Sequence, residues 1–150
     1  MKNKIINLFR IFFPLIIGGL IGFLISNNMD YNTLNKPFLS PPSIIFPIVW
    51  SILYILIGYS YYYYRKYNND INLNIVYYIQ LILNFIWPIL FFSLKLRLFS
   101  IFWLITLLIT TIILLIQYKK YSKRSFYLTI PYIIWLIFAL YLNIGVYILN

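Results

Sequence analysis

The stretch that decides the fold is Ile75–Leu94, IVYYIQLILNFIWPILFFSL, in which 20 consecutive residues carry no charged side chain. A helix of about 20 apolar residues crosses the roughly 30 Å hydrocarbon core of a bilayer. A backbone exposed to lipid must satisfy its own N–H and C=O groups, which a helix does and an open strand does not. The stretch therefore predicts a membrane-spanning helix.

Four more apolar runs of similar length are separated by short polar or basic clusters. The five predicted spans cover about residues 8–25, 42–64, 75–94, 98–118 and 126–149. We therefore expect a single domain over residues 1–150, an all-α integral membrane protein built as a five-transmembrane-helix bundle.

The first run has a second interpretation, because basic residues precede it as they precede a secretory signal peptide. It ends in Ser26-Asn27-Asn28, however, where a signal peptide would carry small residues at a cleavage site. This ending favours a span that stays in the protein.

The composition excludes most other classes. Hydrophobic residues make up 63% of the chain and charged residues 9%, whereas a soluble domain carries about 25% charged residues. The net charge of +10 would suggest nucleic acid in a soluble protein, but here the basic residues flank the spans, so no nucleic acid is expected. With no Cys or His and only Asp30 and Asp70 as acidic residues, we expect no metal or resident cofactor and almost no acid–base catalysis.

The Lys and Arg residues divide unevenly between the two sides that five spans define. Nine belong to the N-terminus and the two loops on its side, and three (Lys36, Lys95 and Arg97) belong to the other side. Because basic residues concentrate in the cytoplasm, the N-terminus is expected there and the C-terminus outside. The run Tyr61–Tyr64, beside the basic Arg65, fits an aromatic belt at the cytoplasmic interface.

Polar and aromatic residues recur at helical spacing in four of the spans. Positions three, four and seven apart share one face of a helix, and amides facing lipid are costly, so these stripes are expected to face inward. The four stripes are Phe46, Trp50 and Leu53 with Tyr54 at the edge; Gln80, Asn84, Trp87 and Phe91; Trp103, Thr106, Thr110 and Gln117; and Tyr132, Trp135, Ala139 and Asn143.

Two interpretations of the stripes stay open. They either line a cavity for a ligand or join the helices through hydrogen bonds and aromatic packing. Trp50 and Trp135 lie too deep in their spans for a headgroup belt, which favours a flat aromatic ligand. No Asp, Glu, Lys or Arg lies deep in a span, which argues against an ion-driven transporter. Gly18 and Gly22 form a small-xxx-small pair that favours close packing inside the bundle over dimerisation.

Three blocks of the sequence carry a family resemblance. They are Lys36-Pro37-Phe38-Leu39-Ser40-Pro41-Pro42 with Phe46, Val49-Trp50 and Leu53-Tyr54; Gln80–Asn84 with Trp87 and Leu90–Phe92; and Pro131-Tyr132 with Trp135, Phe138-Ala139 and Tyr141–Asn143. In order and spacing these blocks resemble the TspO/MBR family, the translocator proteins, also called tryptophan-rich sensory proteins or peripheral-type benzodiazepine receptors.

Three departures from the family pattern are visible. Pro47 and Pro88 each lie one place earlier than the family's proline, which would alter the pocket walls locally because proline bends a helix. The basic residue of the animal members' sterol motif is missing after Tyr147, so sterol transport loses support.

The resemblance implies a function and a set of site residues. The family binds porphyrins such as protoporphyrin IX in a pocket closed by the first loop, and some members bind drugs. Carried over by motif, Trp50 and Trp135 would flank the ligand; Asn84, Trp87, Phe91 and Ala139 would line the cavity; Pro42 and Phe46 would lie near its mouth.

The implied protein is a membrane receptor or sensor of tetrapyrroles and related flat hydrophobic molecules, and the family makes a homodimer plausible. Two alternatives are light-dependent porphyrin degradation through Trp50 and Trp135, and carriage of sterol or lipid. Lys36 is a candidate partner for porphyrin carboxylates, against the simpler interpretation of a solvated loop lysine. Since His and Cys are absent and Met29 lies at a span end, metal-free porphyrin is favoured over haem.

Overall fold

The computed structural model describes residues 2–150; Met1 and the side chain of Lys2 lie outside the described part. Its elements are the helices α1 (Lys2–Ile25), α2 (Ile45–Tyr67), α3 (Ile71–Pro88), α4 (Arg97–Tyr121) and α5 (Lys123–Leu149), with a short 3₁₀ turn η1 (Ser26–Asn28) and a π-helical turn η2 (Ile89–Ser93). Five helical segments are long and apolar enough to cross a membrane, and the described residues include no strand. The prediction of an all-α, five-helix membrane fold is confirmed.

The helices start at other residues than the predicted spans: most start earlier, whereas α2 starts later. Helices α1, α3 and α5 begin several residues before the apolar runs, because polar residues outside the hydrocarbon can still be helical. Asp70 caps α3 by accepting a 2.8 Å hydrogen bond from the backbone N–H of Asn72. Helix α2 begins at Ile45, three residues late, because the chain first forms turns there: the N–H of Ile45 donates to the Pro42 carbonyl at 3.0 Å, and that of Phe46 donates to the Ser43 carbonyl at 3.3 Å.

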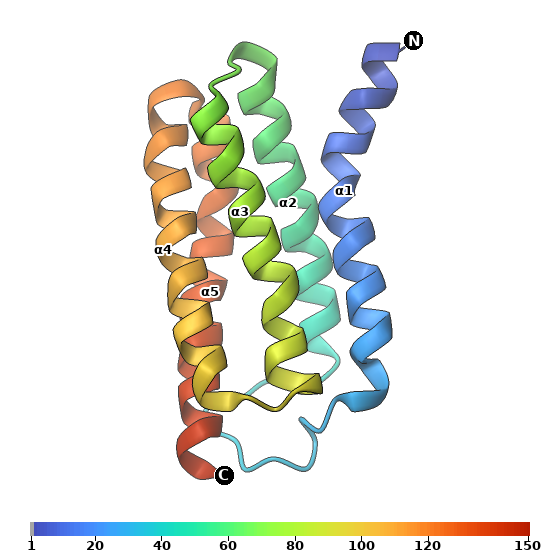
Figure 1. Cartoon of the computed structure of the whole chain (residues 1–150), viewed down its shortest axis with the longest axis vertical. Coiled ribbons are helices and arrows are strands. Elements are labelled where there is room, and N and C mark those ends of the chain that lie inside the picture. Colours follow the sequence, from blue (N-terminus) through green and yellow to red (C-terminus); the bar gives the residue numbers. More distant parts are fainter. Residues whose placement is uncertain (1) are drawn as a thin grey trace.

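The helices form a bundle with α1 at one edge (Figure 1). Helix α1 packs mainly on α2, α2 also packs on α5, and α4 packs between α3 and α5. The loop of residues 29–44, the corner at residues 94–96 and the C-terminus lie together at one end of the bundle, which we call the loop end (Figure 1). The N-terminus and the two remaining turns lie at the opposite end.

The predicted inward stripes of α3 and α5 are confirmed. Gln80, Asn84 and Trp87 of α3 are buried, and so is Phe91, which continues their stripe in η2. In α5, Tyr132, Ala139 and Asn143 are buried and Trp135 is half-buried.

The predicted stripe of α4 is wrong in its middle. Thr106 is exposed, and its hydroxyl donates to the carbonyl of Phe102 at 3.0 Å; Thr110 donates in the same way to Thr106 at 2.7 Å. A threonine hydroxyl can be satisfied by its own helix, so it does not have to face inward. The buried polar residues of α4 are Ser100 and Thr111.

The tyrosine run is only in part an interfacial belt. Tyr64 is fully buried, and its hydroxyl accepts from the backbone N–H of Asp70 at 2.8 Å and donates to the Asp70 carbonyl at 3.2 Å. Tyr61 is also buried and stacks on Tyr77 with ring centroids 3.8 Å apart. For Tyr61 and Tyr64 the belt interpretation is therefore wrong, because these rings hold the α2–α3 turn and the helix core.

Glycines set how closely α1 and α2 approach. A Cβ on Gly18 would overlap the ring of Tyr54, and a Cβ on Gly58 would meet the backbone of Ile11. Gly22 has no neighbour that a Cβ would touch within 4 Å. The Gly18–Gly22 pair thus packs internally at its first member only, and its second member faces open space.

Candidate ligand cavity

A cavity of about 460 Å³ lies between α1, α2 and α3, next to η2 and both ends of the loop. This volume falls in the usual range of small-molecule sites, about 300–1,000 Å³. Gly19 and Gly22 line the cavity on the α1 side, where a Cβ on either would have no neighbour within 4 Å. The missing side chains of α1 therefore leave much of this space open.

Four of the eight predicted site residues line the cavity: Phe46, Trp50, Asn84 and Trp87. The two tryptophans are neighbours, with ring centroids 6.4 Å apart and planes inclined by 35°. They form an aromatic wall that α2 and α3 share.

The other four predicted residues do not line the cavity. Phe91 stacks behind Trp87 with ring centroids 5.5 Å apart, and Pro42 is an exposed residue of the loop. Trp135 packs against Phe46, with ring centroids 6.1 Å apart, and Ala139 is buried in the core. The structure therefore does not bring Trp50 and Trp135 together on one cavity wall.

Asn84 is the centre of a buried hydrogen-bond chain that joins three helices. Its Oδ1 accepts from the Tyr54 hydroxyl at 2.8 Å, and its Nδ2 donates to the Tyr132 hydroxyl at 2.6 Å. Tyr132 donates in turn to Oε1 of Gln80 at 3.1 Å. The amide of Asn84 is therefore used by the protein itself, which supports the interpretation that this polar stripe joins the helices.

Trp87, on the cavity wall, also carries a polar group without a partner. Its indole Nε1 is buried and has no hydrogen-bond partner in the part of the chain that the structure describes. A buried donor without a partner is costly, so this N–H lowers the stability of the wall. No charged side chain of residues 3–150 lines the cavity, so its wall is mainly aromatic and apolar.

Two sequence interpretations about the cavity's chemistry need correction. Lys36 does not line the cavity, because its ammonium donates to the Tyr31 carbonyl at 3.2 Å and lies 4.9 Å from the Tyr31 ring centroid. Met29 does line the cavity, although its place at a span end suggested otherwise. Because a thioether is a haem ligand, the ligand types present no longer favour metal-free porphyrin over haem.

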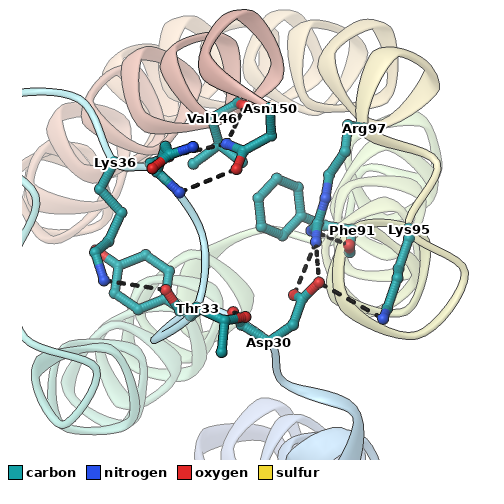
Figure 2. Close-up of polar contacts among 10 residues, drawn as sticks. Asp30, Thr33, Lys36, Phe91, Lys95, Arg97, Val146 and Asn150 are labelled. Atoms are coloured by element: carbon teal, nitrogen blue, oxygen red, sulfur yellow. Dashed lines mark hydrogen bonds and ion pairs between the residues drawn. The ribbon is translucent and has the colours of Figure 1, made fainter.

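The loop of residues 29–44 covers the loop end of the bundle and is fastened at several points (Figure 1). Asp30 accepts two hydrogen bonds from Arg97, of 2.8 and 2.7 Å. Asn35 and Asn150 exchange two hydrogen bonds of 3.0 and 2.9 Å (Figure 2). Inside the loop, Tyr31 is buried, and its hydroxyl donates to the Pro41 carbonyl at 2.8 Å. Burial raises the pKa of the Tyr31 phenol, so this donor stays protonated.

The sequence did not single out most of the α1 wall, whereas it did link the two shifted prolines to the pocket walls. Pro47 and Pro88 both line the cavity, and Pro88 ends α3 at the point where the π-helical turn begins. The signal that would have located the α1 wall is the density of glycine, with Gly18, Gly19 and Gly22 inside five residues.

Five membrane-spanning helices with a largely aromatic and apolar cavity inside the bundle define the class of the chain, a multi-pass membrane protein. The family model of the TspO/MBR family matches residues 10–149, and the chain belongs to this family.

Individual relatives agree with this assignment. The chain is 38% identical to the tryptophan-rich protein TspO of Archaeoglobus fulgidus over 122 residues, covering 80% of this chain and 79% of that protein. It is 34% identical to the tryptophan-rich protein TspO of Chlorobaculum tepidum, covering 80% and 78%. It is 32% identical to the translocator protein homolog of Schizosaccharomyces pombe, covering 91% and 87%.

Proposed function

We propose that the protein is a membrane receptor or sensor that binds a flat hydrophobic tetrapyrrole, such as protoporphyrin IX, between α1, α2 and α3. The observation that carries the proposal is the aromatic wall that Trp50 and Trp87 form on a cavity of about 460 Å³. Membership of the TspO/MBR family supports the same ligand class.

The chemistry of the wall suits such a ligand. Aromatic rings stack on indole faces in offset or edge-to-face geometry, and Trp50 and Trp87 supply two such faces. Because no described charged side chain lines the cavity, the two porphyrin carboxylates would lie at its open side, in contact with water or lipid headgroups.

The four tryptophans allow a direct test by protoporphyrin IX titration of the solubilised protein, with tryptophan emission as the readout. Trp50→Phe and Trp87→Phe are expected to weaken binding about tenfold each, in the range of losing an aromatic contact in a ligand site. Trp135→Phe is expected to weaken it less, because Trp135 lies behind Phe46. Trp103→Phe is the control, because Trp103 donates to the Leu83 carbonyl at 2.8 Å and lies off the cavity.

The relative effects of the variants distinguish this cavity from the site that the resemblance implies, between Trp50 and Trp135. A larger loss of affinity in Trp135→Phe than in Trp87→Phe would show that the ligand binds on the other side of Trp50. Absence of saturable binding in the parent protein would reject the tetrapyrrole proposal.

The same titration under illumination tests porphyrin degradation. Trp50 contacts Trp87, Tyr54 and Tyr132, so electron donors other than Trp135 surround it. We expect stable porphyrin absorbance in light if the protein is a receptor only, and protein-dependent bleaching if it is an enzyme. A parallel titration with haemin, in the parent and in Met29→Leu, tests whether the thioether takes part in binding.

The orientation also belongs to this proposal. Because nine basic residues lie on one side and three on the other, we propose that the N-terminus is cytoplasmic and the loop end lies outside. A single cysteine in the loop, in a chain that has none, would then react with an impermeant reagent added to intact cells. The homodimer implied by the resemblance stays a prediction.

A further inference from the structure

The loop over the cavity begins with an ion pair that is shielded from water. Asp30 is the only acidic side chain at the loop end, since Asp70 lies in the α2–α3 turn at the other end. Nη2 of Arg97 lies 2.8 and 2.7 Å from the two carboxylate oxygens of Asp30 (Figure 2). The side chains of Arg97 and Asp30 are 13% and 21% exposed, whereas that of Lys95, 3.7 Å from the same carboxylate, is 60% exposed. Arg97 is therefore the main partner of Asp30.

Arg97 is held in place independently of Asp30. Its Nη1 donates to the carbonyl of Phe91, and its guanidinium carbon lies 4.3 Å from the Phe91 ring centroid. Phe91 belongs to η2, at the end of α3, where backbone carbonyls lack partners within the helix. The guanidinium thus caps the end of α3 and offers its other nitrogen to the loop.

The ion pair lies directly beside the cavity and ties two of its walls together. Met29, the residue before Asp30, lines the cavity from the loop side. Phe92, the residue after Phe91, lines it from the η2 side. Breaking the pair would separate these two walls without disturbing the packing of α1 on α2, which is formed at Gly18 and Gly58.

We propose that the Asp30–Arg97 pair is a latch that keeps the loop wall closed and sets the rate at which molecules enter and leave the cavity. The identity of the molecule rests on the proposed function, whereas the opening of the wall does not depend on it. Loop opening of this kind takes place on timescales from nanoseconds to milliseconds, so it is measured as an accessibility or an exchange rate.

Cysteine accessibility tests the latch without any ligand. The chain has no native cysteine, and Ile25 is 5% exposed and lines the cavity, so Ile25→Cys gives a single buried thiol. The rate of its labelling by a small water-soluble thiol reagent reports opening of the wall. Adding Asp30→Asn is expected to raise this rate about tenfold, because a shielded hydrogen bond between charged groups is lost.

Three further variants serve as matched comparisons. Lys95→Gln removes the exposed ammonium beside the same carboxylate and is expected to change the rate less than about twofold. Asp30→Glu keeps the charge and is expected to label close to the parent rate. Arg97→Lys keeps the positive charge without the second nitrogen for Phe91, and as a milder change it is expected to label at an intermediate rate.

The outcomes distinguish the latch from the ligand assignment. Equal labelling rates in the parent, Asp30→Asn and Arg97→Lys would overturn the latch, whatever binds. Faster labelling in Asp30→Asn, with no saturable protoporphyrin IX binding in any variant, would support the latch and reject the proposed ligand. Faster labelling together with faster protoporphyrin IX dissociation would support both. An equal rise in Lys95→Gln and Asp30→Asn would overturn the specific role of Arg97.

Discussion

Helix α1 is attached to the rest of the bundle in two different ways. Along its length it meets α2 through close apolar contacts, with Gly18 against the ring of Tyr54 and Gly58 against the backbone of Ile11. At the loop end it is attached through the Asp30–Arg97 ion pair. Close-packed groups have no other partner to turn to when they separate, whereas separated charged groups can hydrogen-bond to water instead. The same cavity wall is therefore fixed along the helix and releasable at its end.

The largest expected effect is on the packed attachment. Gly58→Ala places a Cβ against the Ile11 backbone, which cannot move aside as a flexible side chain would. We therefore expect the free energy of unfolding to fall by about 1–3 kcal/mol. The measurement is thermal or denaturant unfolding in detergent. Gly22→Ala is the matched control, since nothing lies within 4 Å, and it is expected to be neutral or to stabilise by up to about 1 kcal/mol. Equal unfolding of the two variants would show that the α1–α2 seam is not close-packed.

An intermediate effect is expected from the buried hydrogen-bond chain, which is polar but shielded. Tyr132→Phe leaves Nδ2 of Asn84 and Oε1 of Gln80 without their partner, at an expected loss of about 1–2 kcal/mol in the same unfolding measurement. Tyr127→Phe, at an exposed position of the same helix, is expected to change little. If both variants unfold alike, the buried chain contributes nothing beyond packing.

The smallest effect is expected at the exposed end of the loop. Asn35→Ala removes the side-chain hydrogen bond to the Leu149 carbonyl, at 3.3 Å, and leaves the backbone contacts with Asn150 in place. We expect less than about 0.5 kcal/mol in global unfolding, with a measurable rise in proteolysis of the loop. Asn32→Ala, at another exposed loop position, is the control. A large global loss in Asn35→Ala would mean that the exposed contacts, and not the latch, hold the loop.

The five spans and the inward face of α3 were predictable from the sequence because both depend on local pattern. The length of each apolar run determines a span, and the spacing of Gln80, Asn84 and Trp87 determines which face of α3 points inward. The stripe of α4 misled because the spacing of Thr106 and Thr110 is the same whether a hydroxyl bonds across helices or to its own backbone.

The position of the cavity was not predictable, because it depends on how far apart the helices lie. The sequence shows that Trp50 and Trp135 both face inward, yet Trp50 packs on Tyr132 and lies between the cavity and α5. Asp30 and Arg97 are 67 residues apart and share no motif, so no local pattern indicates that they meet.

Closure of the cavity also depends on the number of residues in the π-helical turn η2. A π turn holds one residue more than an α turn, and each residue added to a helix rotates the rest of the chain by about 100°. The N–H of Leu94 bonds the carbonyl of Ile89 at 2.9 Å, and within this turn Phe91 and Phe92 are both buried. Deleting one residue from Ile89–Ser93 would let the corner close as an ordinary helix and turn Arg97 away from Asp30. Such a deletion, which keeps both Asp30 and Arg97 in the sequence, would then open the cavity as effectively as a charge substitution.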